Sequence, residues 1–309
     1  MKILFTIAHY FKPQVGAKYG SQGKSTVTQR VHALRAAISS LHQLYGSAQA
    51  VLRISDHQAL PANDSLGAKI DVVVCTVGED HLLGQIGLPV HSLLQRRTQA
   101  QPLLLGYECH AVLREAMGHY DYYCFLEDDL VLHDPLFFAK LRWFNQKTSD
   151  DNLLQPNRFE VSAMTAVNKV YIDGDIPPAA TARFQNPMEQ PVLNASVMGA
   201  SMQFQRALNP HSGCFFLNQA QLERWVGQPY FLDRKADFVG PLESAASLGI
   251  MRTFRLYKAA PRNAAFLEIQ HAGTAFLSLL GSTIRLSPEL MARLPESATT
   301  SPTHSEKAG

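Results

Sequence analysis

The sequence has few cysteines, no long apolar run and no large excess of charge of either sign. Its four cysteines stand singly within apolar runs, with no Cys-x-x-Cys pair: Cys75, Cys109, Cys124 and Cys214. This spacing argues against a structural zinc site or a disulfide framework, and single buried thiols fit a reducing compartment. No stretch approaches the roughly 20 apolar residues that span a bilayer. A net charge of +2 gives no reason to expect nucleic acid as a partner.

The composition instead indicates a globular protein with a substantial core. The 309 residues are 46% hydrophobic and 17% charged, which suits one large domain or two small ones. The opening residues 1–8 are typical of a first strand and not of a secretory signal, because His9 interrupts the apolar run. We therefore expect a cytoplasmic protein. We expect residues 297–309, rich in Ser and Thr, to form a disordered tail.

An acidic triplet follows an apolar, aromatic-rich run. Residues 122–126 (Tyr-Tyr-Cys-Phe-Leu) are typical of a strand buried on both faces, and Glu127, Asp128 and Asp129 come directly after them. Three adjacent carboxylates repel one another and resist desolvation, so something must compensate them. A divalent cation is the usual partner of clustered carboxylates, with a substrate phosphate supplying further ligands. A solvated turn is the simpler alternative.

Hydrophobic periodicity predicts strands alternating with helices in the first half. We expect strands over residues 2–8, 50–54 and 70–77, a helix from Val27 to Tyr45 capped by Ser25 or Thr26, and a helix ending at Gly118 before the acidic strand. This order implies a mostly parallel sheet covered by helices. Ligands of such sheets bind at the carboxyl ends of the strands, where the acids stand.

The second half is less regular. Short strands are expected over residues 158–164, 169–172, 252–257 and 267–273, and a glycine and short buried strand begin at Gly213. Residues 177–210 are rich in Pro, Ala, Asn and Gln and weakly periodic, which predicts a long loop of the kind that serves as a lid.

The run from Tyr120 to Asp134 resembles the metal-binding Asp-x-Asp element of GT-A-type glycosyltransferases, with Glu127-Asp128-Asp129 at its three positions and Glu in place of the first Asp. In that family the motif ends a strand and holds Mn2+ or Mg2+ against the diphosphate of a nucleotide sugar. The resemblance implies an α/β, GT-A-like (Rossmann-like), mostly parallel sheet flanked by helices. Residues 1–132 would be the nucleotide-sugar-binding half, and residues 133–296 the acceptor-side half of the same domain.

The resemblance also implies roles for single residues. Glu127, Asp129 and His271 would be metal ligands. The assignment of Asp129 is the stronger, because Glu127 replaces the Asp of the family motif with a longer side chain. Glu243, at the head of a helix, would be the base that removes the acceptor proton in inverting members. From the residues alone, Glu243 could equally be an acid in the first turn of a helix that interacts favourably with the helix dipole. His271 could be an ordinary surface or core histidine, and Glu268 is an alternative acidic residue nearby.

The resemblance implies that the nucleotide-sugar donor contacts the end of the first strand, two arginines and the middle acid of the triplet. These residues are Thr6, Ala8, His9, Tyr10, Arg30, Arg53 and Asp128. A diphosphate needs cations, and the sequence does not choose among Arg30, Arg53, Lys169, Arg252 and Lys258. The glycine-bearing loop from His9 to Lys24 could receive phosphate at the helix that follows. It is not a P-loop, because Lys18 stands where that motif needs glycine.

We therefore predict a metal-dependent, hexosyltransferase-like glycosyltransferase that moves a sugar from a nucleotide donor, UDP being favoured, to a hydroxyl of a glycan or other acceptor. One alternative is a nucleotidyltransferase, which would release pyrophosphate. Another is a non-catalytic sugar- or nucleotide-binding module, in which Glu243 and His271 lie far from Asp129. The opening residues also resemble GT-B glycosyltransferases, but the second half lacks the regular alternation of a second Rossmann-like domain.

Overall fold

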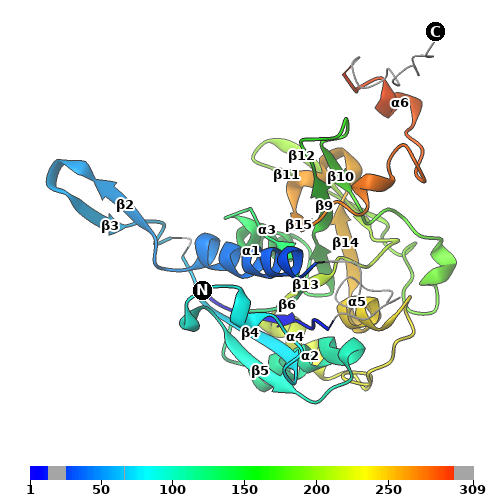
Figure 1. The fold of residues 1–309 in the computed structure, drawn as a ribbon. Coiled ribbons are helices and arrows are strands. Elements are labelled where there is room, and N and C mark those ends of the chain that lie inside the picture. The colour runs from blue at the N-terminus through cyan, green and yellow to red at the C-terminus, as the bar shows by residue number, and fades with distance from the viewer. Residues whose placement is uncertain (13–25, 66, 296–309) are drawn as a thin grey trace, which may run out of the picture.

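The main sheet of the protein is built from its first half and one strand of its second. The computed structural model describes residues 1–12, 26–65 and 67–295, so most of the glycine-bearing loop and the expected tail lie outside it. The strand order is β13-β6-β1-β4-β5 (Figure 1). The strands are β1 (Lys2–Ala8), β4 (Lys69–Val77), β5 (Leu94–Thr98), β6 (Tyr122–Glu127) and β13 (Cys214–Asn218). All run parallel except β13, which is antiparallel to β6.

Helices cover both faces of this sheet. Because side chains alternate along a strand, Ile3 and Phe5 of β1 pack with one group of helices and Leu4 with the other. The first group is α1 (Val27–Tyr45) and α3 (Phe137–Lys147); the second is α2 (Leu105–Glu115), α4 (Gln219–Val226) and α5 (Pro241–Thr253). The predicted α/β class is confirmed.

The first helix begins and ends as the sequence predicts. Thr26 is its N-cap, and its side chain accepts a hydrogen bond from the backbone N–H of Gln29, whose side chain returns to Thr26 in a capping box. Gly46 is the C-cap. The remaining helix, α6 (Pro288–Met291), is a single turn near the end of the described chain.

Two further sheets of four strands each are built from residues after the acidic triplet. Their orders are β10-β9-β15-β7 and β11-β12-β14-β8. The strands are β7 (Leu130–Val131), β8 (Asn152–Gln155), β9 (Asn157–Val161), β10 (Lys169–Tyr171), β11 (Val192–Val197), β12 (Ala200–Arg206), β14 (Arg255–Ala259) and β15 (Glu268–His271). The chain leaves the main sheet at Glu127 and enters the second sheet at Leu130. The acidic triplet therefore stands at the junction of two sheets.

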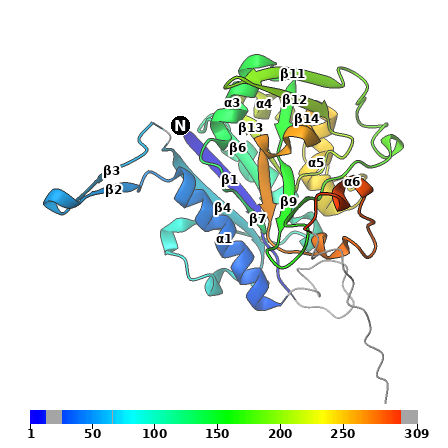
Figure 2. The same ribbon diagram turned by 90° about the horizontal axis from the view of Figure 1, so that it is seen from above.

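Two expectations are wrong. The strand predicted over residues 50–54 is present as β2 (Ala50–Arg53), but the expectation that it joins the main sheet is wrong. It pairs with β3 (Gln58–Pro61) in a hairpin that projects from the body (Figures 1 and 2). Residues 177–210 are not one long loop, because β11 and β12 form an antiparallel hairpin there. Leu193, Ala195 and Val197 of β11 pack on the core and alternate with the exposed Asn194 and Ser196, which is the period of two of a half-buried strand. The prediction followed the Pro-, Asn- and Gln-rich composition of the whole segment and missed this short alternation.

None of the helices in the described ranges is long and apolar enough to cross a membrane.

Candidate active site

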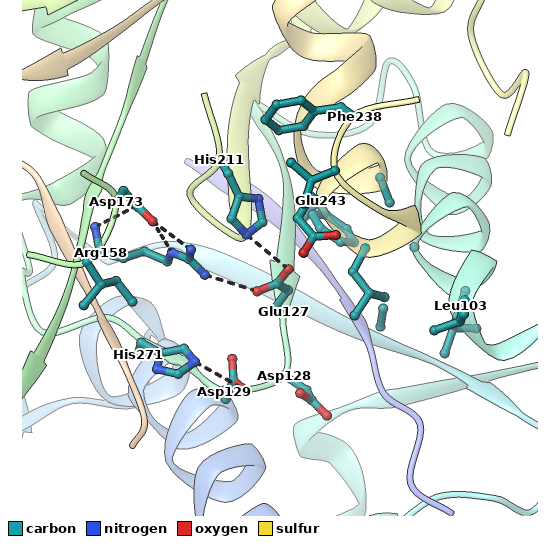
Figure 3. Close-up of a pocket in the computed structure, with 18 of the residues that line it drawn as sticks. Leu103, Glu127, Asp128, Asp129, Arg158, Asp173, His211, Phe238, Glu243 and His271 are labelled. Atoms are coloured by element: carbon teal, nitrogen blue, oxygen red, sulfur yellow. Dashed lines mark hydrogen bonds and ion pairs between the residues drawn. The ribbon is translucent and has the colours of Figure 1, made fainter. Parts of the chain in front are cut away.

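A pocket of about 680 Å³ lies at the carboxyl ends of β1 and β6 (Figure 3). The end of β1 contributes Ala8 and Tyr10 to its lining. The acidic triplet enters from β6, and Glu243 and His271 come from elements far along the chain. The structure thus brings all the metal-ligand and base residues expected from the sequence to one pocket.

Backbone pairing brings His271 to the acidic triplet. Strand β15 runs antiparallel to β7, with His271 opposite Leu130. The next residue, Ala272, donates its N–H to the carbonyl of Asp129 at 2.8 Å. As a result, Nε2 of His271 lies 3.6 Å from Oδ2 of Asp129.

A buried carboxylate supports His271 from behind. Glu160, on the adjacent strand β9, is fully buried. Its Oε1 lies 2.9 Å from Nδ1 of His271, and its Oε2 accepts the N–H of Leu277 at 2.8 Å. Burial raises the pKa of Glu160, but these hydrogen bonds outweigh it and leave the pKa below its ordinary value. An ionised carboxylate only accepts, so Nδ1 carries the hydrogen and Nε2 faces Asp129.

Glu127 lies beside a different set of residues. Its Oε2 lies 3.5 Å from Nη1 of Arg158, and its Oε1 lies 3.8 Å from Nε2 of His211. Burial raises the pKa of Glu127 to about 7 against the opposing charge of Arg158. Gly213 makes room for this side chain, because a Cβ there would stand 2.5 Å from Oε2 of Glu127. Glu127 is therefore a weaker candidate for the metal than Asp129.

Arg158 is held by a buried ionic network that the sequence did not reveal. Its Nε and Nη2 donate to Oδ1 of Asp173 at 2.9 and 2.7 Å. Lys258 donates to the other oxygen of Asp173 at 3.1 Å and to the carbonyl of His211 at 2.7 Å. These side chains are less than a tenth exposed. Lys258, considered for the diphosphate, thus has a structural position behind the pocket.

Arg30 compensates the other two acids. Its Nη1 donates to Oδ2 of Asp129 at 3.1 Å, and its Nη2 donates to Asp128. The fully buried His9 accepts the N–H of Leu82 through Nε2 and donates from Nδ1 to Asp128. Although burial raises the pKa of Asp128, the charge of Arg30 and the bond from His9 hold it below its ordinary value. Both carboxylate oxygens of Asp128 therefore already accept hydrogen bonds from protein side chains.

The structure does not bring the other predicted donor residues to the pocket. Thr6 is buried and donates to the carbonyl of Cys124 at 2.9 Å. Arg53 pairs with Asp56 in the projecting hairpin. Lys169 pairs with Glu268, and Arg252 pairs with Asp233. Of the five basic candidates for the diphosphate, Arg30 is the one found in the pocket lining of the described chain.

Glu243 lies in the first turn of α5, close to where α5 meets α2. The two helices approach so closely that a Cβ on Gly106 would stand 2.6 Å from Cβ of Ala245. Oε2 of Glu243 is buried and has no hydrogen-bond partner among the described residues. A carboxylate oxygen with a free lone pair in a pocket can accept a proton from a bound hydroxyl.

Two residues of the lining, Asp129 and His271, could serve as ligands of a divalent cation that takes the rest of its coordination from a substrate. Within residues 1–12, 26–65 and 67–295, no group of three or more His, Cys, Asp and Glu side chains could hold a metal by itself. Asp129 and His271 offer two ligands, and Oδ1 of Asp129 is buried without a partner in the described chain. Two protein ligands suit a cation that also binds phosphate oxygens.

The charge of the lining agrees with this. Five carboxylates face two guanidinium groups: Glu127, Asp128, Asp129, Asp173 and Glu243 against Arg30 and Arg158. A diphosphate entering so acidic a pocket needs a cation beside it. No protein-family model and no curated protein matches the chain, so the functional assignment rests on this geometry.

Proposed function

We propose that the chain is a metal-dependent glycosyltransferase of the GT-A type, which transfers a sugar from a nucleotide-sugar donor, UDP-linked by preference, to a hydroxyl acceptor. The observation that carries the proposal is the pair formed by Asp129 and His271, 3.6 Å apart at the carboxyl end of β6 and supported by Glu160. Open α/β sheets bind their ligands at this end.

Asp129 and His271 would hold Mn2+ or Mg2+, which when bound acts as a Lewis acid on the departing diphosphate. Glu160 keeps His271 in the tautomer that presents Nε2. Arg30 pairs with Asp128 and Asp129, so its guanidinium stands beside the position where phosphate charge would develop.

Glu243 is the base of this proposal if the reaction inverts configuration. Its Oε2, which has no hydrogen-bond partner within the described ranges, belongs to the same pocket as the acids, as general-base catalysis requires. A retaining course needs no such base, so the stereochemistry of the product decides the role of Glu243.

The test is the variant Asp129→Ala, with the exposed Asp64→Ala as control. We expect Asp129→Ala to lose Mn2+-dependent binding of UDP in calorimetric titration, while circular dichroism shows an intact fold. We expect the control to bind as the wild type does. Equal UDP affinity in Asp129→Ala and the wild type overturns the proposal.

Product analysis separates the two alternative functions. Wild-type protein is incubated with Mn2+ and UDP-sugars, and released UDP is measured. Pyrophosphate released from a nucleoside triphosphate and a sugar phosphate instead identifies a nucleotidyltransferase. UDP-sugar binding without release of either product identifies a binding module.

A further inference from the structure

The wall of the pocket opposite its charged residues is apolar. Pro102 and Leu103 come from a short 3-10 helix before α2. Phe238 and Val239 come from the segment just before α5, and Leu242 comes from its first turn. Leu103 lies across the pocket from Arg158 and Asp173, with Glu243 between them in Figure 3. We call the side of the pocket with the acidic triplet, Arg158 and Asp173 the charged half. The side lined by the 3-10 helix and the start of α5 is the apolar half, and Glu243 is its charged lining residue.

The backbone at this wall is held in an unfavourable conformation. Val239 has φ of +57°, which a β-branched residue rarely adopts, and its side chain is 72% exposed although it lines the pocket. The left-handed backbone conformation of Val239 costs free energy, and the side chain is too exposed for its own burial to offset that cost. Strain of this kind gathers at ligand sites.

The diphosphate and the metal of the proposed donor account only for the charged half. Glu243, the proposed base, stands on the same helix as Leu242 and borders the apolar half. The group whose proton Glu243 removes therefore has apolar protein surface beside it. Apolar pocket surface of this kind is stabilised when a ligand removes it from water.

We infer that the acceptor carries an apolar group next to its reacting hydroxyl, and that Leu103 and Val239 select for that group. The inference rests on the proposed function, because it assigns the apolar half to the acceptor. The apolar group could be an aromatic ring or an alkyl chain, and both would contact the same wall.

Three probes with one sugar and different aglycones test this: phenyl, octyl and methyl β-glucoside. Binding is measured by calorimetry without donor, so the result does not depend on turnover. We expect the phenyl or the octyl compound to bind at least about tenfold more tightly than the methyl compound. Tighter phenyl binding identifies an aromatic neighbour and tighter octyl binding an alkyl one. Equal affinity for all three overturns the inference.

Variants then locate the effect. Leu103→Asp and Val239→Asp each put a charge on the wall, and Asp tolerates the left-handed backbone at position 239. We expect both to lose most of the aglycone preference. The control is Val90→Asp, at a residue that is 94% exposed and outside the pocket lining. The inference also falls if Val90→Asp loses as much preference as Val239→Asp.

A separate titration with UDP and Mn2+ distinguishes this inference from the proposed function. UDP binding without an aglycone preference overturns the inference alone. An aglycone preference without UDP binding overturns the glycosyltransferase.

Discussion

Glu160 receives a hydrogen bond from Nδ1 of His271 at 2.9 Å, although 111 residues of chain separate the two. The contact exists because β15 lies parallel to β9, with Gln270 opposite Phe159. It fixes one ring nitrogen of His271 and leaves the other directed at Asp129. Metal-binding histidines are supported by a carboxylate in this way.

Glu160→Gln tests whether this support matters for the metal. Gln keeps the shape of the side chain but removes its charge, so it orients His271 less firmly. We expect the affinity for Mn2+ in the presence of UDP to fall by about 10–100-fold, measured by calorimetry. Glu268→Gln makes the same chemical change in a carboxylate that pairs with Lys169 and Tyr171. Its Mn2+ affinity should stay at the wild-type value; an equal loss in both variants would contradict the role of Glu160.

Gly213→Ala is expected to displace Glu127 and to destabilise the fold. The new Cβ would meet Oε2 of Glu127 at 2.5 Å, and φ of Gly213 is +62°. Gly199→Ala is the matched control, because its φ is +82° and a Cβ there meets nothing within 4 Å. Both variants place a side chain at a backbone position with positive φ. The difference between their losses of unfolding free energy therefore reports the clash with Glu127. We expect Gly213→Ala to lose about 1–3 kcal/mol more of unfolding free energy in urea denaturation. Equal losses would show that Glu127 moves aside freely.

Local patterns predicted the elements that carry the acids. Three elements have the predicted positions: the strand over residues 2–8, the helix from Val27 to Tyr45 with its Thr26 cap, and the acidic strand. Each depends on residues within one element, so period and capping suffice to find it.

The partners of the acids could not be found in this way. A divalent cation is the compensation expected from the sequence. Arg30, Arg158 and two histidines, His9 and His211, also lie beside the acids, and the sequence did not reveal their proximity. The contacts of Arg30 with Asp129 and of His9 with Asp128 join residues 99 and 119 positions apart. They depend on how α1 and the end of β1 are placed against β6, and no local spacing encodes that placement.

The network around Asp173 predicts a large loss of stability on substitution. Asp173→Ala leaves two buried cations, Arg158 and Lys258, without their shared carboxylate. Removing one partner from a buried ion pair costs about 3–5 kcal/mol, so we expect a loss of this size in urea denaturation. Asp56→Ala breaks the exposed pair with Arg53 and should cost about 1 kcal/mol or less. A loss below about 1 kcal/mol in Asp173→Ala would show that the network adds little to stability.

The buried His110 should make the unfolding free energy decrease as the pH falls. Its ring is buried against Phe125, Phe215 and Trp225. Burial disfavours the charged ring and lowers the pKa of His110 to about 3, from an ordinary value of 6.5. Between these two pH values the unfolded chain binds more protons than the folded one. The stability contributed by the neutral ring is therefore complete above about pH 6.5 and is lost as the pH falls, by up to about 1.4 kcal/mol per pH unit.

His110→Phe removes this titration and retains an aromatic ring of similar shape. We expect the variant to lose less unfolding free energy than the wild type between pH 6 and pH 4, measured by urea denaturation at each pH. His211 is largely buried, and this burial lowers its pKa to about 3, but His211 titrates in both proteins and its contribution cancels in the comparison. The control His91→Phe changes an exposed histidine and should keep the acid sensitivity of the wild type. Parallel pH profiles for His110→Phe and the wild type would mean that the buried ring accepts its proton without unfolding the protein.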